Sequence, residues 1–548
     1  MLDSMNRWAD VNGVYQIYPR SFMDKDDDGY GDILGIVDKL DYLKGSQGSL
    51  DVDAIWLSPF YTSPMVDGGY DISDYCEVDP LFGTLADFKH LLDQAHRRRI
   101  QVMVDFVPNH TSNLHPWFVD STSSLKSKHR DWYIWRDGQT DGSAPNNWLC
   151  AAGGSAWQYN DITKQYYLHS FLKEQPDLNW DNPEVVTAMT AVVDFWLSKG
   201  VDGLRVDAVQ FMAKKRSFDD NPPNLAYIEG RDDPYHSQHH NFSGSGRQLK
   251  GYLAAVAAVV ERYDDRLLFF EFYADNSMAS SKDSFRPYLD LYDVNPRVAM
   301  PFNFGGMFMD FRADSFRDFI GTAQSFLTDQ HVPVYCFGNH DQSRLVSRFG
   351  RNQARLIAMM QLTLPGIPVM YYGDELGMGD GDISGELIQD SFEKNSPGRG
   401  LGRDPERTPM QWSHQPSAGF SQGKPWLPLP AKLADITVAD QQFDDGSFLA
   451  LYRSILALRS HNIALRRGKY VTDGTNNTQV FSYKRFDTNA EFMISLNFSD
   501  HSAICLVDES DWQIVVTTGQ AVVRLDKTTL ELLPCQGVIL KRRIQTGD

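Results

Sequence analysis

The sequence predicts an α/β fold, a (β/α)8 barrel with an inserted subdomain after its third strand and a C-terminal antiparallel β-sandwich. Short apolar runs alternate with amphipathic stretches over about 370 residues, which indicates parallel strands joined by helices. Polar residues follow many of these runs, which favours a closed barrel over an open doubly wound sheet, where they would gather at one crevice. After about Tyr470 only strand-like runs remain, and these predict the sandwich.

Seven apolar runs predict strands of the barrel. They are rich in β-branched and aromatic residues and end in polar or turn-forming residues. They lie near Val14, Ile55, Val104, Leu204, Leu268, Val334 and Val369. The segment between the third and fourth runs is too long for an ordinary connection and is rich in Trp, His, Asn and Gly, so we expect a subdomain there.

The length of the chain predicts more than one domain. Its 548 residues exceed the length at which a single core stops growing, roughly 250 to 300 residues. We assign residues 1–107 and 181–465 to the barrel, residues 108–180 to the inserted subdomain B and residues 466–548 to the sandwich. Five runs predict the strands of the sandwich: VFSYKRF, EFMISLNF, SAICLVD, WQIVVTT and GVILKRR.

The composition argues against several classes of partner. A net charge of −20 does not suit nucleic acid or an anionic membrane, both of which need a basic surface. No apolar run approaches the roughly 18 residues of a membrane span, and no signal-peptide pattern opens the chain, so we expect a soluble, cytoplasmic protein. The cysteines lack paired spacing and indicate reduced thiols: Cys76, Cys150, Cys336, Cys505 and Cys535. No pattern indicates an oligomeric state.

Three acidic residues at the ends of predicted strands are candidates for catalysis. Asp207 lies two positions after Arg205 in GLRVDAV, so both side chains point to the same side of the strand. An arginine lowers the pKa of a neighbouring carboxyl group and keeps it ionised, as a nucleophile requires. Glu271 follows the apolar run RLLFF, and Asp341 follows VPVYCF in FGNHDQSR. A single such residue is more often a helix cap or a structural ion pair, but a barrel gathers all three at one mouth.

The motifs resemble those of glycoside hydrolase family 13, the α-amylase family, and within it the α-glucosidase and oligo-1,6-glucosidase branch. DFVPNH, GLRVDAV, the strand before Glu271 and FGNHD look like the four conserved blocks of the family. QPDLN and GRDPERTPMQW look like two further segments of the branch. The six segments occur in the family order and span nearly the whole chain.

The resemblance implies a role for each acid: Asp207 the nucleophile, Glu271 the general acid and base, and Asp341 the stabiliser of the transition state. Hydrolysis with retention needs an ionised and a protonated carboxyl group about 5 to 5.5 Å apart. The aromatic residues around Glu271 predict apolar surroundings, which suit a proton donor. Many relatives carry a glycine before the acid, where this chain has Phe270.

The resemblance also places six residues in the subsite for the non-reducing glucose: Asp67, Tyr70, His110, Arg205, His340 and Arg407. We expect the ring of Tyr70 to stack on the sugar, and Asp67 and Arg407 to pair and bind its hydroxyl groups. Arg403 is the alternative to Arg407, which we favour because it directly precedes the TPMQW run. A pocket closed in this way predicts exo-action on short sugars.

The segment DKDDDGYGD predicts a structural cation site. Its candidate ligands are Asp24, Asp26, Asp28, the Tyr30 carbonyl and Asp32, with a glycine at the turn. Oxygen ligands at alternate positions around a hard cation are typical of an EF-hand loop. The resemblance implies Ca²⁺ or Mg²⁺ here, and a metal-free acidic turn is the alternative. No organic cofactor is expected, because GYGDILG lacks the spacing of a phosphate-binding loop.

Substrate preference stays open between several alternatives. Ala208 follows the nucleophile, where α-1,6-specific relatives often carry valine, so the resemblance favours α-1,4 links in maltose and short maltooligosaccharides, or sucrose. An oligo-1,6-glucosidase, or an α-glucosyl transferase that passes glucose to a sugar instead of water, are the enzymatic alternatives. A partner protein like the transporter heavy chains is less well supported, because such proteins need a membrane helix and commonly lose the catalytic acids.

Overall fold

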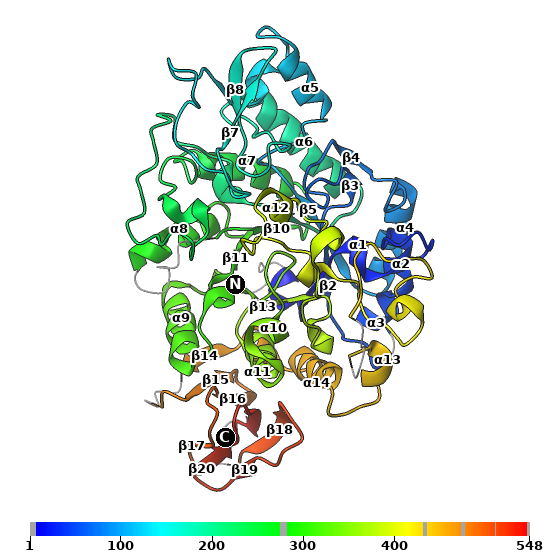
Figure 1. The fold of residues 1–548 in the computed structure, drawn as a ribbon. Helices are drawn as coiled ribbons and strands as arrows, with labels where there is room; N and C mark the ends of the chain where they lie inside the picture. The colour runs from blue at the N-terminus through cyan, green and yellow to red at the C-terminus, as the bar shows by residue number, and fades with distance from the viewer. Residues whose placement is uncertain are drawn as a thin grey trace.

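The computed structural model contains a closed barrel of eight parallel strands (Figure 1). It describes residues 7–45, 47–273, 282–430, 436–472, 477–509 and 511–544. In order around the barrel the strands are β1 (Val14–Ile17), β2 (Ala54–Leu57), β5 (Gln101–Phe106), β9 (Gly203–Val206), β10 (Leu267–Phe270), β11 (Ala299–Asn303), β12 (Val334–Cys336) and β13 (Ile367–Tyr371). The predicted fold class is therefore confirmed.

The interior of the barrel is filled by alternate residues of its strands. Trp56, Phe269 and Phe302 belong to one buried cluster, with ring centroids 5.1 Å apart for Phe269 and Phe302. In β9 the inward position is Gly203, where a Cβ would lie 3.2 Å from a side-chain atom of Met103. Because side chains alternate along a strand, Arg205 and Asp207 follow Gly203 on the inner side, at the end of the barrel where β9 terminates.

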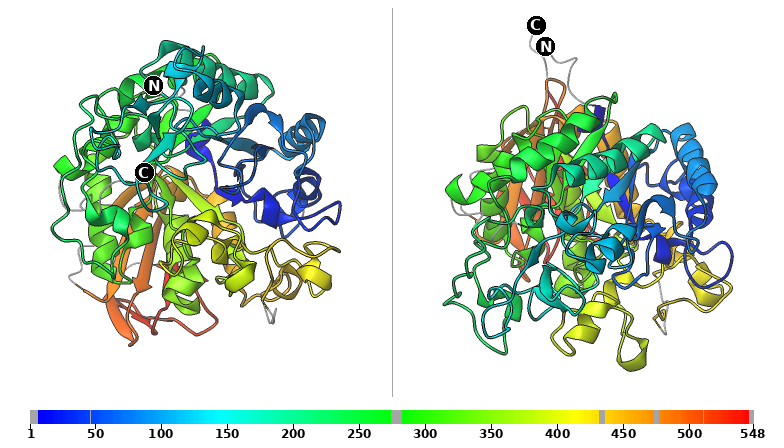
Figure 2. Two further views of the ribbon diagram at one scale, coloured as in Figure 1. Left: turned by 45° about the horizontal axis from the view of Figure 1, so that its top comes forward. Right: turned by 90° about the horizontal axis from the view of Figure 1, so that it is seen from above.

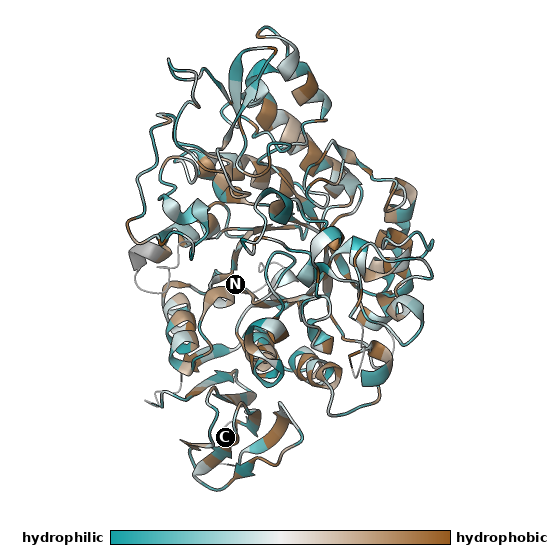
Figure 3. Ribbon diagram, in the orientation of Figure 1, coloured by the Kyte–Doolittle hydropathy of each residue, from teal (hydrophilic) through white to brown (hydrophobic). Residues whose placement is uncertain are grey.

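Helices cover the outside of the barrel (Figure 3). Brown and teal residues alternate along many of the helices, and in the helix Leu85–Arg97 the buried residues Phe88, Leu91, Leu92 and Ala95 recur at the spacing of one helix face. The longer helices are α4 (Leu85–Arg97), α6 (Pro183–Ser198), α7 (Leu249–Val260), α8 (Lys282–Tyr292), α9 (Ala313–Phe326), α11 (Arg351–Thr363) and α14 (Phe448–Ser460). The shorter ones are α1 (Pro19–Phe22), α2 (Ile33–Asp38), α3 (Leu40–Leu43), α10 (Leu345–Phe349), α12 (Ser391–Asn395), α13 (Val438–Gln441) and α15 (Ile463–Arg466).

One barrel strand is absent from the seven predicted runs. Strand β11 has the sequence AMPFN, and all five of its residues are buried. A proline argues against a central strand, because it cannot donate a hydrogen bond to a neighbouring strand. The strand nevertheless pairs with β10 through Leu268 and Ala299 and with β12 through Phe302 and Val334.

The segment between β5 and α6 carries its own small sheet. It contains α5 (Pro116–Ser123) and an antiparallel sheet in the order β6 (Trp135–Arg136), β8 (Gln165–Leu168), β7 (Trp157–Asn160). The sheet packs on a separate apolar cluster that includes Trp148 and Leu172. A two-stranded sheet of β3 (Tyr61–Thr62) and β4 (Asp74–Val78) precedes it. The segment lies at the top of Figure 1, opposite the end that holds the last strands.

The last part of the chain forms two antiparallel sheets around a common core. One has the order β14 (Lys469–Thr472), β15 (Val480–Phe486), β16 (Ala490–Asn497), β21 (Gly537–Arg543), β18 (Gln513–Thr517), and the other β17 (Ala503–Leu506), β20 (Thr529–Leu532), β19 (Arg524–Leu525). The larger sheet packs against the barrel, drawn orange beside green in Figure 2, where Tyr483 and Thr363 share a 2.5 Å hydrogen bond. Within the described ranges we find no helix with the length and hydropathy of a membrane span.

Candidate active site

The three predicted catalytic acids lie at the C-terminal ends of neighbouring barrel strands. Asp207 directly follows β9, Glu271 directly follows β10, and Asp341 lies in the loop after β12. Asp207 and Glu271 are buried, and the side chain of Asp341 is 23% exposed. The barrel therefore brings together acids that are far apart in the sequence, as expected for strand ends that share one mouth.

Arg205 joins three carboxyl groups at the centre of the mouth. One terminal nitrogen of its guanidinium lies 2.6 Å from Asp207 and 2.6 Å from Asp105, and the other lies 2.6 Å from Glu271. The arginine is fully buried, so these contacts are shielded from water. Three carboxyl groups on one cation leave an excess of potential negative charge, and this shifts their ionisation.

Arg205 lowers the pKa of Asp207, as expected, but it does not keep that pKa low. Burial raises that pKa well above its ordinary value, and although Arg205 opposes the rise, the charges of Glu271 and Asp105 and a hydrogen bond between the carboxyl groups of Asp207 and Glu271 add to it. Burial also raises the pKa of Asp105 to about 6. Arg205 thus holds Asp207 on one terminal nitrogen of its guanidinium and Glu271 on the other.

The carboxyl group of Glu271 is bound by polar partners. One of its oxygens pairs with Arg205, and the other accepts a 2.7 Å hydrogen bond from the backbone N–H of Ala208. Phe269 and Phe270 instead pack in two different core clusters, because neighbouring side chains of a strand point to opposite sides. The surroundings of Glu271 are thus polar and well ordered.

Asp341 is held by two arginines from a later loop and by the neighbouring His340. Arg407 donates to its Oδ1 over 2.8 Å, Arg403 lies 3.4 Å from the same oxygen, and His340 lies 3.3 Å from the other. Burial alone would raise the pKa of Asp341, but His340, Arg407 and Arg403 together hold it below its ordinary value. Asp341 is therefore a fixed negative charge beside the Asp207–Glu271 pair.

Aromatic rings form one wall of the mouth. The ring of Tyr70 stacks on His340 with centroids 5.3 Å apart, and the ring of Tyr18 stacks on His340 at 5.9 Å. The hydroxyl group of Tyr70 lies 2.7 Å from His340 Nε2 and 3.2 Å from Asp105. Since one face of Tyr70 is covered by His340, only its other face is available to stack on a sugar.

The expected pair of Asp67 with Arg407 is wrong, because Asp67 pairs with Arg403 over 2.5 Å. Arg403 also makes two hydrogen bonds to the buried carboxylate of Asp390, and Arg407 points to Asp341 instead. The other oxygen of Asp67 accepts from Gln175 over 2.8 Å.

His110 completes this side of the mouth. Its Nε2 lies 3.1 Å from Gln175 Nε2, which also bonds to Asp67. Burial lowers the pKa of His110 to about 4, so its imidazole is neutral at physiological pH. The six predicted sugar-binding residues and the three acids thus belong to one network, and Arg403 belongs to it as well.

This constellation has a counterpart in a described family. The model of the α-amylase catalytic domain matches residues 16–468, which include every acid of the mouth. The chain belongs to the α-amylase family. The family assignment agrees with the closed barrel and with the carboxyl groups at its C-terminal mouth.

Relatives within the α-amylase family share most of the length of the chain. A probable α-glucosidase of Rhizobium meliloti is 38% identical over 92% of this chain and 91% of its own. An oligo-1,6-glucosidase of Heyndrickxia coagulans is 34% identical over 93% of this chain and 96% of its own. Among solved structures, the α-glucosyl transfer enzyme XgtA superimposes with a TM-score of 0.90 and is 37% identical in sequence; the match covers 98% of this chain and 99% of that of XgtA. The trehalulose synthase MutB superimposes with a TM-score of 0.85 and is 32% identical; the match covers 98% of this chain and 100% of that of MutB.

Several residues of the mouth were not among the predicted site residues. Asp105 and Gln175 open the motifs DFVPNH and QPDLN, so their place in matched motifs was an available signal. Asp390 caps the short helix α12 through the N–H of Phe392, so its position suggests only a structural role. Its role became visible only through the two hydrogen bonds from Arg403.

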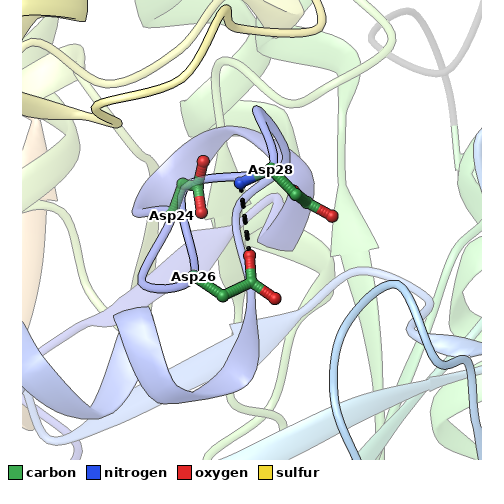
Figure 4. Close-up of side chains that lie close together, drawn as sticks. All are labelled: Asp24, Asp26 and Asp28. Carbon is green, nitrogen blue, oxygen red and sulfur yellow. Dashed lines mark hydrogen bonds between the residues drawn. The ribbon is translucent and has the colours of Figure 1, made fainter.

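The acidic loop of this α-amylase-family chain lies between α1 and α2, away from the catalytic acids in sequence. Oxygen atoms of Asp24, Asp26 and Asp28 lie within 4.8 Å of one another (Figure 4). Asp24 is buried and accepts from the backbone N–H groups of Asp27 and Gly29, both over 2.7 Å. Burial, followed by the charge of Asp28, raises the pKa of Asp26. Three hard oxygen donors gathered so closely fit a divalent cation.

Asp32, also predicted as a ligand, caps helix α2. One oxygen accepts from the N–H of Gly35 over 2.7 Å and the other from the N–H of Lys25 over 2.6 Å. A carboxylate oxygen that accepts one hydrogen bond retains a lone pair for a cation. Tyr30 follows in the same loop, and its N–H donates to Asp28 over 2.8 Å.

Proposed function

We propose that the protein is a retaining, exo-acting α-glucosidase that hydrolyses the non-reducing terminal α-glucosyl link of maltose, short maltooligosaccharides or sucrose, with α-1,4 links favoured. The observation that carries the proposal is that Asp207 and Glu271 each lie 2.6 Å from a terminal nitrogen of one guanidinium, that of Arg205. Retaining glycosidases keep their two carboxyl groups only about 5 to 5.5 Å apart, whereas inverting ones need room for a water between them. Two carboxyl groups held by one guanidinium are close together, and this suits retention.

The two steps of the reaction use the acids in turn. Asp207 attacks the anomeric carbon while Glu271 gives its proton to the leaving oxygen, and a covalent glucosyl ester forms on Asp207. Glu271 then takes a proton from a water, which attacks the same carbon and releases glucose and the Asp207 carboxylate. Positive charge develops on the sugar in both transition states, and the fixed negative charge of Asp341 stabilises it.

Exo-action is supported by the charged network on one side of the mouth. Asp67, Arg403 and Asp390 are bonded in a row, and Gln175 links Asp67 to His110. Such a row of oriented donors and acceptors is suited to the hydroxyl groups of a terminal glucose. Because the row connects the segments after β2, β5 and β13, a longer chain would have to break it in order to pass.

A transferase and an oligo-1,6-glucosidase are the alternative functions, each favoured by one comparison. XgtA is an α-glucosyl transfer enzyme, and the Heyndrickxia relative is an oligo-1,6-glucosidase. The experiment that separates them is glucose release from maltose, isomaltose, sucrose and trehalose, assayed in parallel with analysis of transfer sugars at high substrate concentration.

Each outcome of that assay has a defined meaning. We expect release from maltose or sucrose and little from isomaltose. Predominant cleavage of isomaltose would overturn the α-1,4 preference, and transfer sugars as the main product would favour the transferase. No release from any of the four sugars would contradict the proposal as a whole.

We also propose that the acidic loop binds Ca²⁺ or Mg²⁺ in a structural role through Asp24, Asp26, Asp28, the Tyr30 carbonyl and Asp32. The cation would neutralise carboxyl groups that otherwise repel one another. A cation that binds only the folded chain stabilises it by about 2.7 kcal/mol at one hundred times its Kd. We therefore expect EDTA to lower the Tm and Ca²⁺ to restore it.

The control for this prediction is a neighbouring acid outside the cluster. Asp26→Asn should abolish the dependence of Tm on Ca²⁺, whereas Asp27→Asn should keep it, because Asp27 accepts from the N–H of Gln422 instead. An identical Tm with EDTA and with Ca²⁺ would contradict a metal site.

A cytoplasmic location is proposed from the cysteines. Cys76, Cys150, Cys336 and Cys535 are free thiols, and two of them, Cys150 and Cys336, are buried. Unpaired thiols suit a reducing compartment. The partner we propose is a small oligosaccharide, and the net charge of −20 does not favour nucleic acid.

A further inference from the structure

Gln16 is a buried polar residue of β1 that contacts the site residue His340 at Nδ1. Its amide Nε2 lies 2.7 Å from His340 Nδ1 and 3.3 Å from Ser58 Oγ. Gln16, Ser58 and His340 are all fully buried. No role in catalysis or binding follows for Gln16 from the mechanism above, because it lies on the far side of His340 from the acids.

His340 is a neutral imidazole and therefore carries a single ring proton. Burial lowers its pKa well below the ordinary value, and Arg407, Arg205 and Arg403 lower it further against the opposing effect of Asp341. In a neutral imidazole one nitrogen donates and the other accepts. The hydrogen bond made by one nitrogen decides where the proton of the other stands.

The hydrogen bonds around His340 form a series in which the donor and the acceptor of each bond can be assigned. At its far end, Asp105 is a carboxylate above its pKa of about 6 and only accepts, so the hydroxyl group of Tyr70 donates to it. The Tyr70 oxygen, which also accepts from Arg205 over 3.3 Å, then accepts from His340 Nε2, 2.7 Å away. With its proton on Nε2, His340 needs a donor at Nδ1, and the Gln16 amide is that donor.

The ionised carboxylate of Asp341 supports the same direction. One of its oxygens lies 3.3 Å from His340 Nε2. A protonated Nε2 attracts this oxygen, whereas a lone pair on Nε2 would repel it. The opposite tautomer would therefore place two lone pairs against each other next to the reacting sugar.

We propose that Gln16 is a positioning residue that keeps the proton of His340 on Nε2, so that this nitrogen donates a hydrogen bond at the sugar site. The inference rests on the proposed glucosidase function. Gln16 acts only through His340, and its contribution is the orientation of one proton.

The test converts the donor at Nδ1 into an acceptor. In Gln16→Glu a carboxylate of nearly the same shape accepts a hydrogen bond from Nδ1 and so favours a proton on that nitrogen. His340 then becomes doubly protonated or changes to the other tautomer. We expect kcat/KM on the best substrate of the wild type to fall by about 10- to 100-fold, as when an outer partner of a functional histidine is removed. A new ionisation should appear in the pH profile. Gln16→Met, which supplies neither donor nor acceptor, should lower activity without that ionisation.

The decisive readout is the ¹⁵N spectrum of histidine-labelled protein, which requires no activity. A protonated and an unprotonated ring nitrogen resonate at different shifts, and the His340 signals are identified by their loss in His340→Gln. We expect a proton on Nε2 alone in the wild type and a proton on Nδ1 in Gln16→Glu. Ser58→Ala, which removes the other partner of the Gln16 amide, is the control and should change kcat/KM by less than about threefold.

An unchanged ¹⁵N spectrum in Gln16→Glu, or a wild-type pH profile with wild-type kcat/KM, would overturn the proposal. If Gln16→Met does not fold, the nearly isosteric Gln16→Glu decides alone. An inactive wild-type enzyme would count against the proposed function, and the ¹⁵N spectrum would still test the placement of the proton.

Discussion

At the scale of single residues, the site consists of buried carboxyl groups with too few cations. Arg205 serves Asp105, Asp207 and Glu271, while Arg403 and Arg407 converge on Asp341. The surplus of negative charge is unfavourable in the empty site but favourable when a sugar acquires positive charge. The same residues that destabilise the folded state therefore stabilise the transition state.

Arg403 is the residue whose replacement distinguishes the observed network from the one expected. Arg403→Lys keeps the charge but loses the fork that joins Asp67, Asp390 and Asp341, so we expect KM to rise about tenfold with a smaller change in kcat. The Tm should fall, because buried carboxylates lose partners. Arg286→Lys on the surface, which alters an exposed pair with Asp290, is the control and should change neither quantity. An unchanged KM in Arg403→Lys would argue against a role in sugar binding.

Asp374 predicts a dependence of stability on pH. Burial raises its pKa to about 7, against opposition from Arg344. Between pH 4 and 7 the unfolded chain releases a proton that the folded chain keeps, so this group destabilises the fold increasingly as the pH rises, by on the order of 4 kcal/mol in all.

Asp374→Asn removes this destabilisation. We expect the Tm of the variant relative to the wild type to increase from pH 5 to pH 8, measured by thermal unfolding in matched buffers. A constant difference between the two proteins over that range would show that Asp374 does not titrate as expected.

At this scale, sequence motifs located the acids but not their partners. Asp207, Glu271 and Asp341 each follow a hydrophobic strand or lie in its loop, so the strand pattern and the barrel together placed them. The choice of Arg407 over Arg403 for Asp67 was wrong, because both arginines stand in an irregular loop. No periodicity fixes the path of such a loop, and a matched motif does not state which acid a guanidinium reaches.

At the scale of elements, the site residues lie at the ends of the barrel strands and in the loops that follow them. The strands fix the positions of these loops. Alternation along β9 directs Gly203 and Arg205 inwards, while the proline in β11 concealed a strand that lies between β10 and β12. Periodicity thus predicts regular elements well and fails where one residue type contradicts the local structure.

The acidic loop offers a prediction at the same scale. Gly29 has a φ of +98°, and a Cβ there would lie 2.1 Å from the carbonyl oxygen of Lys424. Gly29→Ala must move this loop, so we expect a Tm loss equivalent to about 3 kcal/mol and weaker stabilisation by Ca²⁺. Gly142→Ala is the control, because Gly142 has a φ of +84° but no atom within 4 Å of the added Cβ.

The control isolates the steric effect from the strain of a positive φ. Gly142→Ala should lower the stability by only about 1 kcal/mol and leave the response to Ca²⁺ intact. Equal losses of Tm in the two variants, with an unchanged response to Ca²⁺, would show that the loop does not depend on its contact with Lys424.

At the scale of the whole molecule, the chain has three parts with different roles. They are a closed barrel, a segment with its own sheet and a C-terminal pair of sheets. The barrel gathers the acids, and residues 108–180 supply His110 and Gln175 to the same mouth. The C-terminal sheets pack on the far helices, where Arg485 donates to the carbonyl of Thr363 over 2.6 Å. The architecture was predictable from the alternation of strands and helices, but the meeting of distant loops required the structure.

The account depends most on Asp207 forming a covalent bond with glucose. The measurement is mass spectrometry of proteolytic peptides after incubation with a fluorinated glucosyl fluoride, whose glucosyl ester hydrolyses slowly. We predict one added fluoroglucosyl group on the peptide that contains Asp207, with none in Asp207→Asn, which should also lose at least about 10⁴-fold in kcat while remaining folded. A label on another carboxylate, or wild-type turnover by Asp207→Asn, would contradict the account.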